Sequence, residues 1–293
     1  MKKSINSPEV LSQILRAQIN EITEFHIYKN LASSIKDIHN KEILERISNE
    51  ELAHAHFWQQ YTQIEVKPNR WAIFKFTWIC KILGLTFGIK LMEKGETAAG
   101  INYNEIALVI PEAKKIAEDE ERHENALIDM IHEEKLEYIG SVVLGLNDAL
   151  VELTGSLAGF SLALQNTKII AMAGLISGIA AGLSMAASEY LSTKTEESHE
   201  KAFRSSIYTG IAYLITVVFL ILPYLLFTNY LVCLGVTLAI ALLIILVFNY
   251  YLSVAKDYDF KKRFFEMAAI SMGVAALTFG ISWLIKTMLH VSL

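Results

Sequence analysis

The pattern of hydrophobic and polar positions changes character near residue 139. Before this point, apolar residues recur every three or four positions, which is typical of helices with one buried face. Prolines and polar breaks divide this region into segments joined by short connections, and four such helices predict a bundle. The predicted helices span residues 8–38, 40–65, 72–109 and 111–136.

After residue 139 the recurrence of apolar residues every three or four positions gives way to long apolar runs. A helix needs about 20 apolar residues to cross a bilayer, and five segments meet this requirement. They span residues 139–165, 168–191, 206–228, 230–255 and 264–288. The predicted fold class is therefore all-α, with a four-helix bundle over residues 1–137 and a five-helix transmembrane domain over residues 138–293.

Composition supports this division. The 293 residues are 53% hydrophobic and 19% charged, whereas soluble domains are about 45–50% apolar and about 25% charged. Residues 1–138 hold 22 acidic and 17 basic residues, and residues 139–293 hold 9 of each. No basic patch indicates a nucleic-acid partner. The two cysteines, Cys80 and Cys233, lie in different halves and form no metal-binding or disulfide motif.

Flanking charges predict the orientation of the spans. The loops at 192–205 and 256–263 contain lysine and arginine, whereas the opposite turns at 165–168 and 228–230 contain only Lys168. Basic loops stay in the cytoplasm, and no signal-peptide core follows the basic N-terminus. We therefore expect an integral membrane protein, in the cell membrane, with a cytoplasmic N-terminal domain and Leu293 on the opposite side.

Residues 71–92 are apolar enough to suggest a further span. Lys75, Lys81 and Lys90 interrupt this segment. An amphipathic start to the third bundle helix, which touches the membrane surface, fits the pattern better than a sixth span.

Two Glu-x-x-His motifs provide candidate chemistry in the bundle. They are Glu51-Leu-Ala-His54 and Glu120-Glu-Arg-His123, and their spacing places both side chains on one helix face. Glutamate and histidine residues on helices usually lie on the solvated surface, and a single Glu-x-x-His motif arises easily by chance. Two motifs on alternate helices, with glutamate pairs on the other two, match what a di-iron carboxylate site requires. Those pairs are Glu21 with Glu24 and Glu93 with Glu96.

Residues 16–135 resemble a ferritin-like, rubrerythrin-type di-iron domain. The run Glu21, Tyr28, Leu31 and Ala32 is similar to that family's first helix. The two Glu-x-x-His motifs resemble its second and fourth helices, and Glu93 with Glu96 resembles the paired glutamates of its third. The resemblance implies bound iron in the bundle. The chain lacks the rubredoxin-type CxxC pairs that rubrerythrins usually carry. The implied ligands are Glu21, Glu51, His54, Glu93, Glu96, Glu120 and His123, with Glu24 as a further candidate.

The first predicted span contains two carboxylates, Asp148 and Glu152, and the second contains Met185 and Glu189. A carboxylate in mid-bilayer costs at least about 2.5–3.5 kcal/mol, so such residues usually line a cavity or an ion path. Carboxylate oxygens with a thioether suit a borderline metal such as Fe²⁺ or Mn²⁺. The alternative explanation for these carboxylates is that they make structural hydrogen bonds, or lie near a helix end and reach the membrane surface. The glycine series at 155–159 and 174–182 fits a tight helix pair or a dimer interface.

This half resembles the vacuolar iron transporter family. Gly145-Leu-Asn-Asp148-Ala-Leu-Val-Glu-Leu-Thr-Gly is similar to its first-span signature, and Ser184-Met185-Ala-Ala-Ser-Glu189-Tyr-Leu-Ser to its second. The resemblance implies export of Fe²⁺, and often Mn²⁺, in exchange for protons by a homodimer. Asp148, Met185 and Glu189, with Glu152, would line the path. The family's long Glu-rich insert is reduced here to residues 193–205. Proteins that fuse a ferritin-like domain ahead of this transporter domain form a subgroup that the whole chain resembles.

Two functions follow. The favoured one is a transporter whose bundle captures iron and oxidises or senses it. The alternative is a membrane-anchored di-iron oxidase or peroxidase, which would make the protein an enzyme whose spans only anchor it. An anchor does not need Asp148 or Glu152 in its apolar core.

Overall fold

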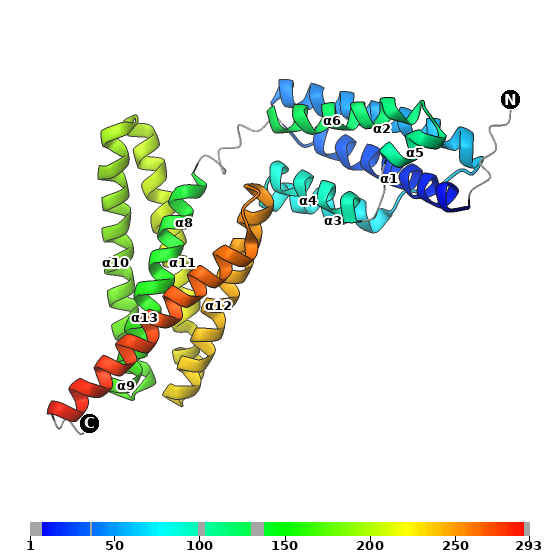
Figure 1. The fold of residues 1–293 in the computed structure, drawn as a ribbon. Helices are drawn as coiled ribbons and strands as arrows, with labels where there is room; N and C mark the ends of the chain where they lie inside the picture. Colours follow the sequence, from blue (N-terminus) through cyan, green and yellow to red (C-terminus); the bar gives the residue numbers. More distant parts are fainter. Residues whose placement is uncertain (1–7, 36, 99–102, 130–137, 290–293) are drawn as a thin grey trace. The chain divides into compact units, whose positions relative to one another are not determined.

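The computed structural model describes residues 8–35, 37–98, 103–129 and 138–289, and every regular element in these ranges is a helix (Figure 1). The chain divides into two compact units, Met1–Glu133 and Glu134–Leu293.

The N-terminal unit begins with two long helices that pack along each other, α1 (Pro8–Ala32) and α2 (Ile38–Thr62). The Asp37 carboxylate caps α2 by accepting a hydrogen bond from the backbone N–H of Asn40 at 2.8 Å. Both helices end a few residues before the positions that the sequence predicts.

The prediction of one continuous helix over residues 72–109 is wrong. The structure has α3 (Arg70–Leu83), α4 (Leu85–Ala98) and α5 (Tyr103–Val109). Gly84 separates the first two with φ 103°, a conformation that favours glycine. The break brings Gly88 of α4 so close to Cys80 of α3 that a Cβ at residue 88 would clash with the sulfur.

The last described helix of this unit is α6 (Ala113–Asp129). The final residues of the predicted helix 111–136, from residue 130 on, lie outside the described part of the chain. Two apolar clusters fill the interior of the unit. One contains Ile14, Trp58, Ile106 and Ile116, and the other contains Ile27, Leu44, Ile47, Met92 and Leu127.

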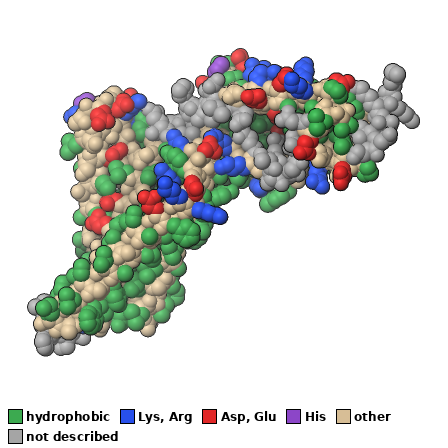
Figure 2. Space-filling view, in the orientation of Figure 1, with side chains coloured by type: hydrophobic (Ala, Val, Ile, Leu, Met, Phe, Trp, Pro, Cys, Tyr) green, Lys and Arg blue, Asp and Glu red, His purple; other side chains and the backbone are tan. Residues whose placement is uncertain are grey.

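The C-terminal unit contains five helical segments long and apolar enough to cross a membrane, as the sequence predicts. The protein is therefore an integral membrane protein. The first segment, Ile139–Leu164, consists of α8 (Ile139–Asp148), a π-helical turn η1 (Ala149–Leu153) and α9 (Thr154–Leu164). The others are α10 (Thr167–Glu196), α11 (His199–Leu226), α12 (Tyr230–Ala255) and α13 (Phe260–Leu289). Hydrophobic side chains cover much of the visible surface of this unit (Figure 2).

The expected loop at 192–205 is almost entirely helical. α10 continues to Glu196, and α11 begins at His199 after the cap residue Ser198. Two ion pairs at i, i+4 spacing favour helix here: Glu197 pairs with Lys201 across the start of α11, and Glu200 pairs with Arg204 within α11.

Small residues bring the spans together within one chain. Gly174, Gly178 and Gly182 of α10 face Ile221, Val217 and Tyr213 of α11. On α9, Gly155 and Gly159 face Thr278 of α13. These glycines therefore form tight helix pairs inside the unit.

Gly145 offers a direct test of this packing. A Cβ here would overlap the carbonyl oxygen of Thr209 in α11, and backbone cannot move aside as a side chain can. We expect Gly145→Ala to destabilise the unit by about 1–3 kcal/mol, the usual cost of overpacking. A lower thermal unfolding temperature in detergent would measure it. Gly140→Ala, on the same helix with nothing within 4 Å of its added Cβ, is the matched control and should not lower that temperature.

Candidate functional site

A cluster of acidic and histidine side chains separates the two apolar clusters of the N-terminal unit. Along α1, Glu21 lies between Ile14 and Ile27, and along α2, Glu51 and His54 lie between Ile47 and Trp58. On α6, Glu120 and His123 lie between Ile116 and Leu127. One atom of each of Glu21, Glu51, His54 and Glu120 lies within 4.8 Å of the others.

The cluster is withdrawn from water. Glu51 is 1% exposed and Glu21 is 2% exposed, and both histidines are buried. Trp58 Nε1 and the Tyr103 hydroxyl both donate hydrogen bonds to Glu21 Oε1, at 3.1 and 3.0 Å. These two aromatic residues hold one oxygen of Glu21 and leave Oε2 directed at His54 Nδ1, 3.4 Å away.

Burial and mutual contact shift the pKa values of these groups in opposite directions. Burial raises the pKa of Glu21 well above its ordinary value, and the charge of Glu120 raises it further. Burial alone would raise the pKa of Glu51 too, but contacts with His123 and His54 lower it to about 2.

The histidines show the complementary effect. Burial alone would lower the pKa of His123, but Glu120 and Glu51 raise it to about 10. The carboxylates of Glu120, Glu21 and Glu51 likewise overcome burial and raise the pKa of His54 far above its ordinary value. Without a metal, protonated imidazoles therefore balance the buried carboxylates.

Three buried atoms of the cluster make no hydrogen bond among the described residues: Glu51 Oε2, His54 Nδ1 and Glu120 Oε1. Buried polar atoms are rarely left unsatisfied. Two ligand atoms about 2.1 Å from one ion lie at most about 4.2 Å apart, which is close to the spread seen here. Carboxylate oxygens and an imidazole nitrogen that converge in this way fit a divalent transition metal.

Two further carboxylates, which the sequence analysis missed, hold the histidines. Asp119 Oδ2 lies 3.4 Å from His54 Nε2, and Glu50 Oε2 is hydrogen-bonded to His123 Nε2. In each imidazole, Nδ1 then faces the cluster. A carboxylate on the outer nitrogen of a histidine fixes the orientation of the ring and raises its basicity.

The pairing is reciprocal, and Arg122 links the two outer carboxylates. Glu50 directly precedes the α2 motif but holds the α6 histidine, and Asp119 directly precedes the α6 motif but holds the α2 histidine. Arg122 donates to Asp119 at 2.6 Å and to Glu50 at 3.0 Å. An acidic residue immediately before each Glu-x-x-His motif was the signal in the sequence that could have revealed this arrangement.

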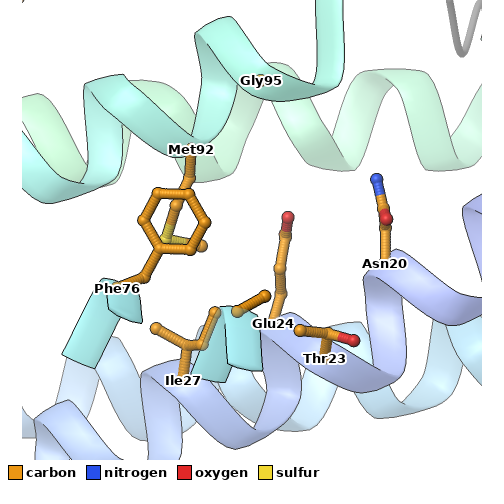
Figure 3. Close-up of a pocket in the computed structure, with 8 residues that line it drawn as sticks. Asn20, Thr23, Glu24, Ile27, Phe76, Met92 and Gly95 are labelled. Atoms are coloured by element: carbon orange, nitrogen blue, oxygen red, sulfur yellow. The ribbon is translucent and has the colours of Figure 1, made fainter. Parts of the chain in front are cut away.

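The remaining predicted ligands lie differently. Glu24 is one helical turn beyond Glu21, and its carboxyl group points into a pocket of about 210 Å³ opposite Met92 and Gly95 of α4 (Figure 3). Glu93 and Glu96 are on α4, but their side chains lie outside the described part of the structure.

The predicted path residues of the membrane unit surround the π-helical turn and the end of α10. Asp148 directly precedes the turn and Glu152 lies within it, where the Tyr213 hydroxyl of α11 donates to Glu152 at 3.2 Å. Glu189 accepts a hydrogen bond from Ser141 of α8 at 2.8 Å. Met185 packs at the edge of the apolar core. Among the described residues, the three predicted path carboxylates, Asp148, Glu152 and Glu189, do not converge as the cluster in the bundle does.

The π-helical turn itself is held from α13. The Ser271 hydroxyl donates to the carbonyl of Leu150 at 2.6 Å, inside the turn. Two more hydroxyls of α13, from Thr278 and Ser282, donate to the carbonyls of Gly155 and Gly159. π-Helical turns are rare and frequently occur at functional sites.

Comparison with known protein families gives one match in this unit. The model of the VIT family matches residues 139–205, which run from α8 into α11 and include Asp148, Glu152, Met185 and Glu189. No curated protein matches the chain. Together with the five apolar segments, the family match fits a membrane metal transporter.

Asp119→Asn and Glu50→Gln test whether the outer carboxylates support metal binding in the bundle. Loss of such a partner typically costs about 10–100-fold in metal affinity, so we expect weaker Fe²⁺ or Mn²⁺ binding with unchanged stoichiometry in titrations of the full chain. Glu118→Gln removes an exposed carboxylate of α6 and is the matched control. Unchanged affinity in both variants would contradict the assigned role.

Proposed function

We propose that the protein exports Fe²⁺, or Mn²⁺, from the cytoplasm through a membrane domain over residues 138–293, in exchange for protons. One observation carries the proposal: Asp148 directly precedes a π-helical turn inside the first apolar segment and Glu152 lies within that turn, and both belong to the residues that match the VIT family. Carboxylates at this depth are costly in lipid. A segment that served only as an anchor would gain nothing from them.

In this proposal Asp148, Glu152, Met185 and Glu189 contact the cation in transit. The oxygens supply hard ligands and the Met185 thioether a softer one, a combination that suits Fe²⁺ and Mn²⁺ better than Na⁺. A carboxylate must lose its proton to bind a metal ion, and it can take one up again when the ion leaves. This exchange couples metal movement to proton movement in the opposite direction.

We propose that two copies of the chain form the working transporter. Glu152 is exposed and Asp148, Met185 and Glu189 are half-exposed in the single chain. A carboxylate on the surface of a membrane span must face water, protein or lipid, and lipid is the costly choice. A second copy packed over this face would enclose the four residues between the subunits.

We further propose that the bundle, residues 1–137, is a cytoplasmic ferritin-like di-iron domain, with the C-terminus on the other side of the membrane. Glu21, Glu51, His54, Glu120 and His123 would hold the iron, joined by Glu24, Glu93 and Glu96. Bound iron would supply one-electron redox chemistry. Asp119 and Glu50 keep the two imidazoles oriented, and the surrounding apolar clusters keep water out. The domain would capture iron and oxidise or sense it.

The alternative is a membrane-anchored di-iron oxidase or peroxidase. The convergence of the buried Glu and His side chains in the bundle favours it, because no comparable group of ligands forms in the described part of the membrane unit. The two functions differ in whether metal crosses the bilayer.

Reconstitution in liposomes that contain a metal-sensitive dye tests transport. We expect Fe²⁺ and Mn²⁺ uptake that accelerates with a pH gradient. Asp148→Asn should slow it by about tenfold or more, since the loss of a charged ligand costs more than the ~1.4 kcal/mol that corresponds to a factor of ten. Asp259→Asn removes a charge at the start of α13, where the Asp259 carboxylate accepts from the Lys262 amide, and Asn can replace it there. This control should transport normally, and equal rates in the two variants would exclude the proposed path.

A double substitution in the bundle separates the transporter from the anchored enzyme. Glu51→Ala with His54→Ala removes two side chains of the cluster, so we expect fewer bound metal ions per full-length chain, measured by elemental analysis. Transport should persist at saturating metal if the spans form the path. Wild-type protein that oxidises Fe²⁺ but moves no metal into the liposomes would instead support the anchored enzyme.

A further inference from the structure

Helix α3 carries an exposed aromatic stripe. Trp71 is 70% exposed and Trp78 is 52% exposed, and Phe74 and Ile82 are exposed beside them. At about 100° per residue, these four side chains cover roughly 80° of the helix surface. The aromatic rings form a continuous row, because Trp71 stacks on Phe74 and Phe74 contacts Trp78. Scattered exposed apolar residues need no explanation, but a continuous stripe of this kind marks an interaction site.

The opposite face of α3 is already occupied. Cys80 is buried in the cluster that contains Leu44 and Ile47 of α2, and Ile73 and Phe76 pack against the same cluster. The stripe is therefore not the face that attaches α3 to its own unit.

Positive charge borders the stripe on both sides. By helical geometry, Lys75 flanks it on one edge and Arg70 and Lys81 on the other. The helix contains no acidic residue, although residues 1–138 as a whole carry a net charge of −5. A basic, aromatic helix in an acidic unit differs in charge from its surroundings.

We propose that α3 lies in the headgroup region of a bilayer that contains anionic lipid, with Trp71, Phe74, Trp78 and Ile82 inserted among the acyl chains. Tryptophan is enriched at this depth because its ring is apolar and its N–H is polar. Lysine and arginine reach the headgroups while their stems cover apolar surface. A helix with one aromatic face and one basic border has the features of an interfacial helix.

The link to the first span makes this contact accessible. α6 ends at Asp129 and α8 begins at Ile139, and the ten Cα–Cα steps between these two residues can span at most about 35 Å. The bundle cannot diffuse away from the bilayer. Even a weak interfacial helix then meets lipid at high local concentration.

A second copy of the chain is the competing occupant of the stripe. A symmetric contact would place the same patch on both partners, so that the three cations of one α3 would face those of the other. Such like-charge contact opposes association. An anionic lipid surface complements the same three charges.

Tryptophan fluorescence of the full chain in lipid nanodiscs tests the proposal. Trp283→Phe removes the tryptophan of α13, and Trp58 is fully buried in the bundle, so lipid quenchers can reach only Trp71 and Trp78. We expect lipids brominated near the headgroup end of the acyl chain to quench this emission more than lipids brominated near the methyl end. A further Trp71→Phe and Trp78→Phe variant supplies the unquenched baseline.

Charge reversal on α3 provides the second arm. Lys75→Glu with Lys81→Glu should abolish the bromine quenching, whereas Lys114→Glu with Lys115→Glu makes the same charge change on exposed positions of α6 and should preserve it. Near-ultraviolet circular dichroism and unfolding temperature would verify that both variants keep the wild-type fold. In wild type, quenching should weaken in purely zwitterionic lipid or at high salt.

Absence of bromine quenching in the wild-type background overturns the proposal. If iodide in solution quenches the emission instead, the stripe faces water. If neither quencher acts and the emission shifts as the protein is diluted, the stripe binds a second copy. None of these readouts depends on metal transport, so the proposal and the proposed function can fail independently.

Discussion

Removing a carboxylate from water costs free energy unless a positive partner is supplied, and this constraint governs both units of the protein. In the bundle, Glu21 and Glu51 are almost fully buried, and two histidines with raised pKa values lie against them. Protons and a metal ion are alternative ways to balance the same buried charge. The apolar clusters on either side make the balance necessary, because they exclude the water that would otherwise solvate it.

The reciprocal pairs extend this balance outward. Each histidine is held on its outer nitrogen by an acid that directly precedes the other helix's motif, and Arg122 pairs with both acids at the surface. The arrangement ties α2 to α6 through charge where neither helix can pack apolar side chains. A layer of polar contacts therefore fills the interior of the bundle between the two hydrophobic clusters.

Much of this organisation follows from sequence, and the exceptions have physical causes. Helical periodicity and span length depend on local composition, so the five spans and the alignment of Glu51 with His54 were predictable. The break at Gly84 was not, because a single glycine inside an apolar run can also be tolerated in a helix. The helical residues on either side of Ser198 were not predicted, because this polar segment resembles a loop until the i, i+4 ion pairs are considered.

Glu50, Asp119 and Tyr103 were missed for a different reason. Each lies outside the three-residue spacing that marks the motifs, and each acts on a side chain from another helix. Sequence spacing reports what one helix presents on one face, whereas these contacts depend on how helices are placed around one another. The sequence predicted the four residues whose atoms converge, Glu21, Glu51, His54 and Glu120, as candidate ligands, but the residues that orient them required the tertiary structure.

The two sets of carboxylates differ in the way that their proposed roles require. A resident ion is retained best by ligands that already converge and are held by further partners, and the cluster around His54 has both features. An ion in transit must bind well enough to enter a path and weakly enough to leave it. In the single chain, Glu152 and Glu189 are spread over two helices, each with a neutral hydroxyl as its partner. A hydroxyl orients a carboxylate without neutralising its charge, so these side chains remain able to attract a cation that protons can replace.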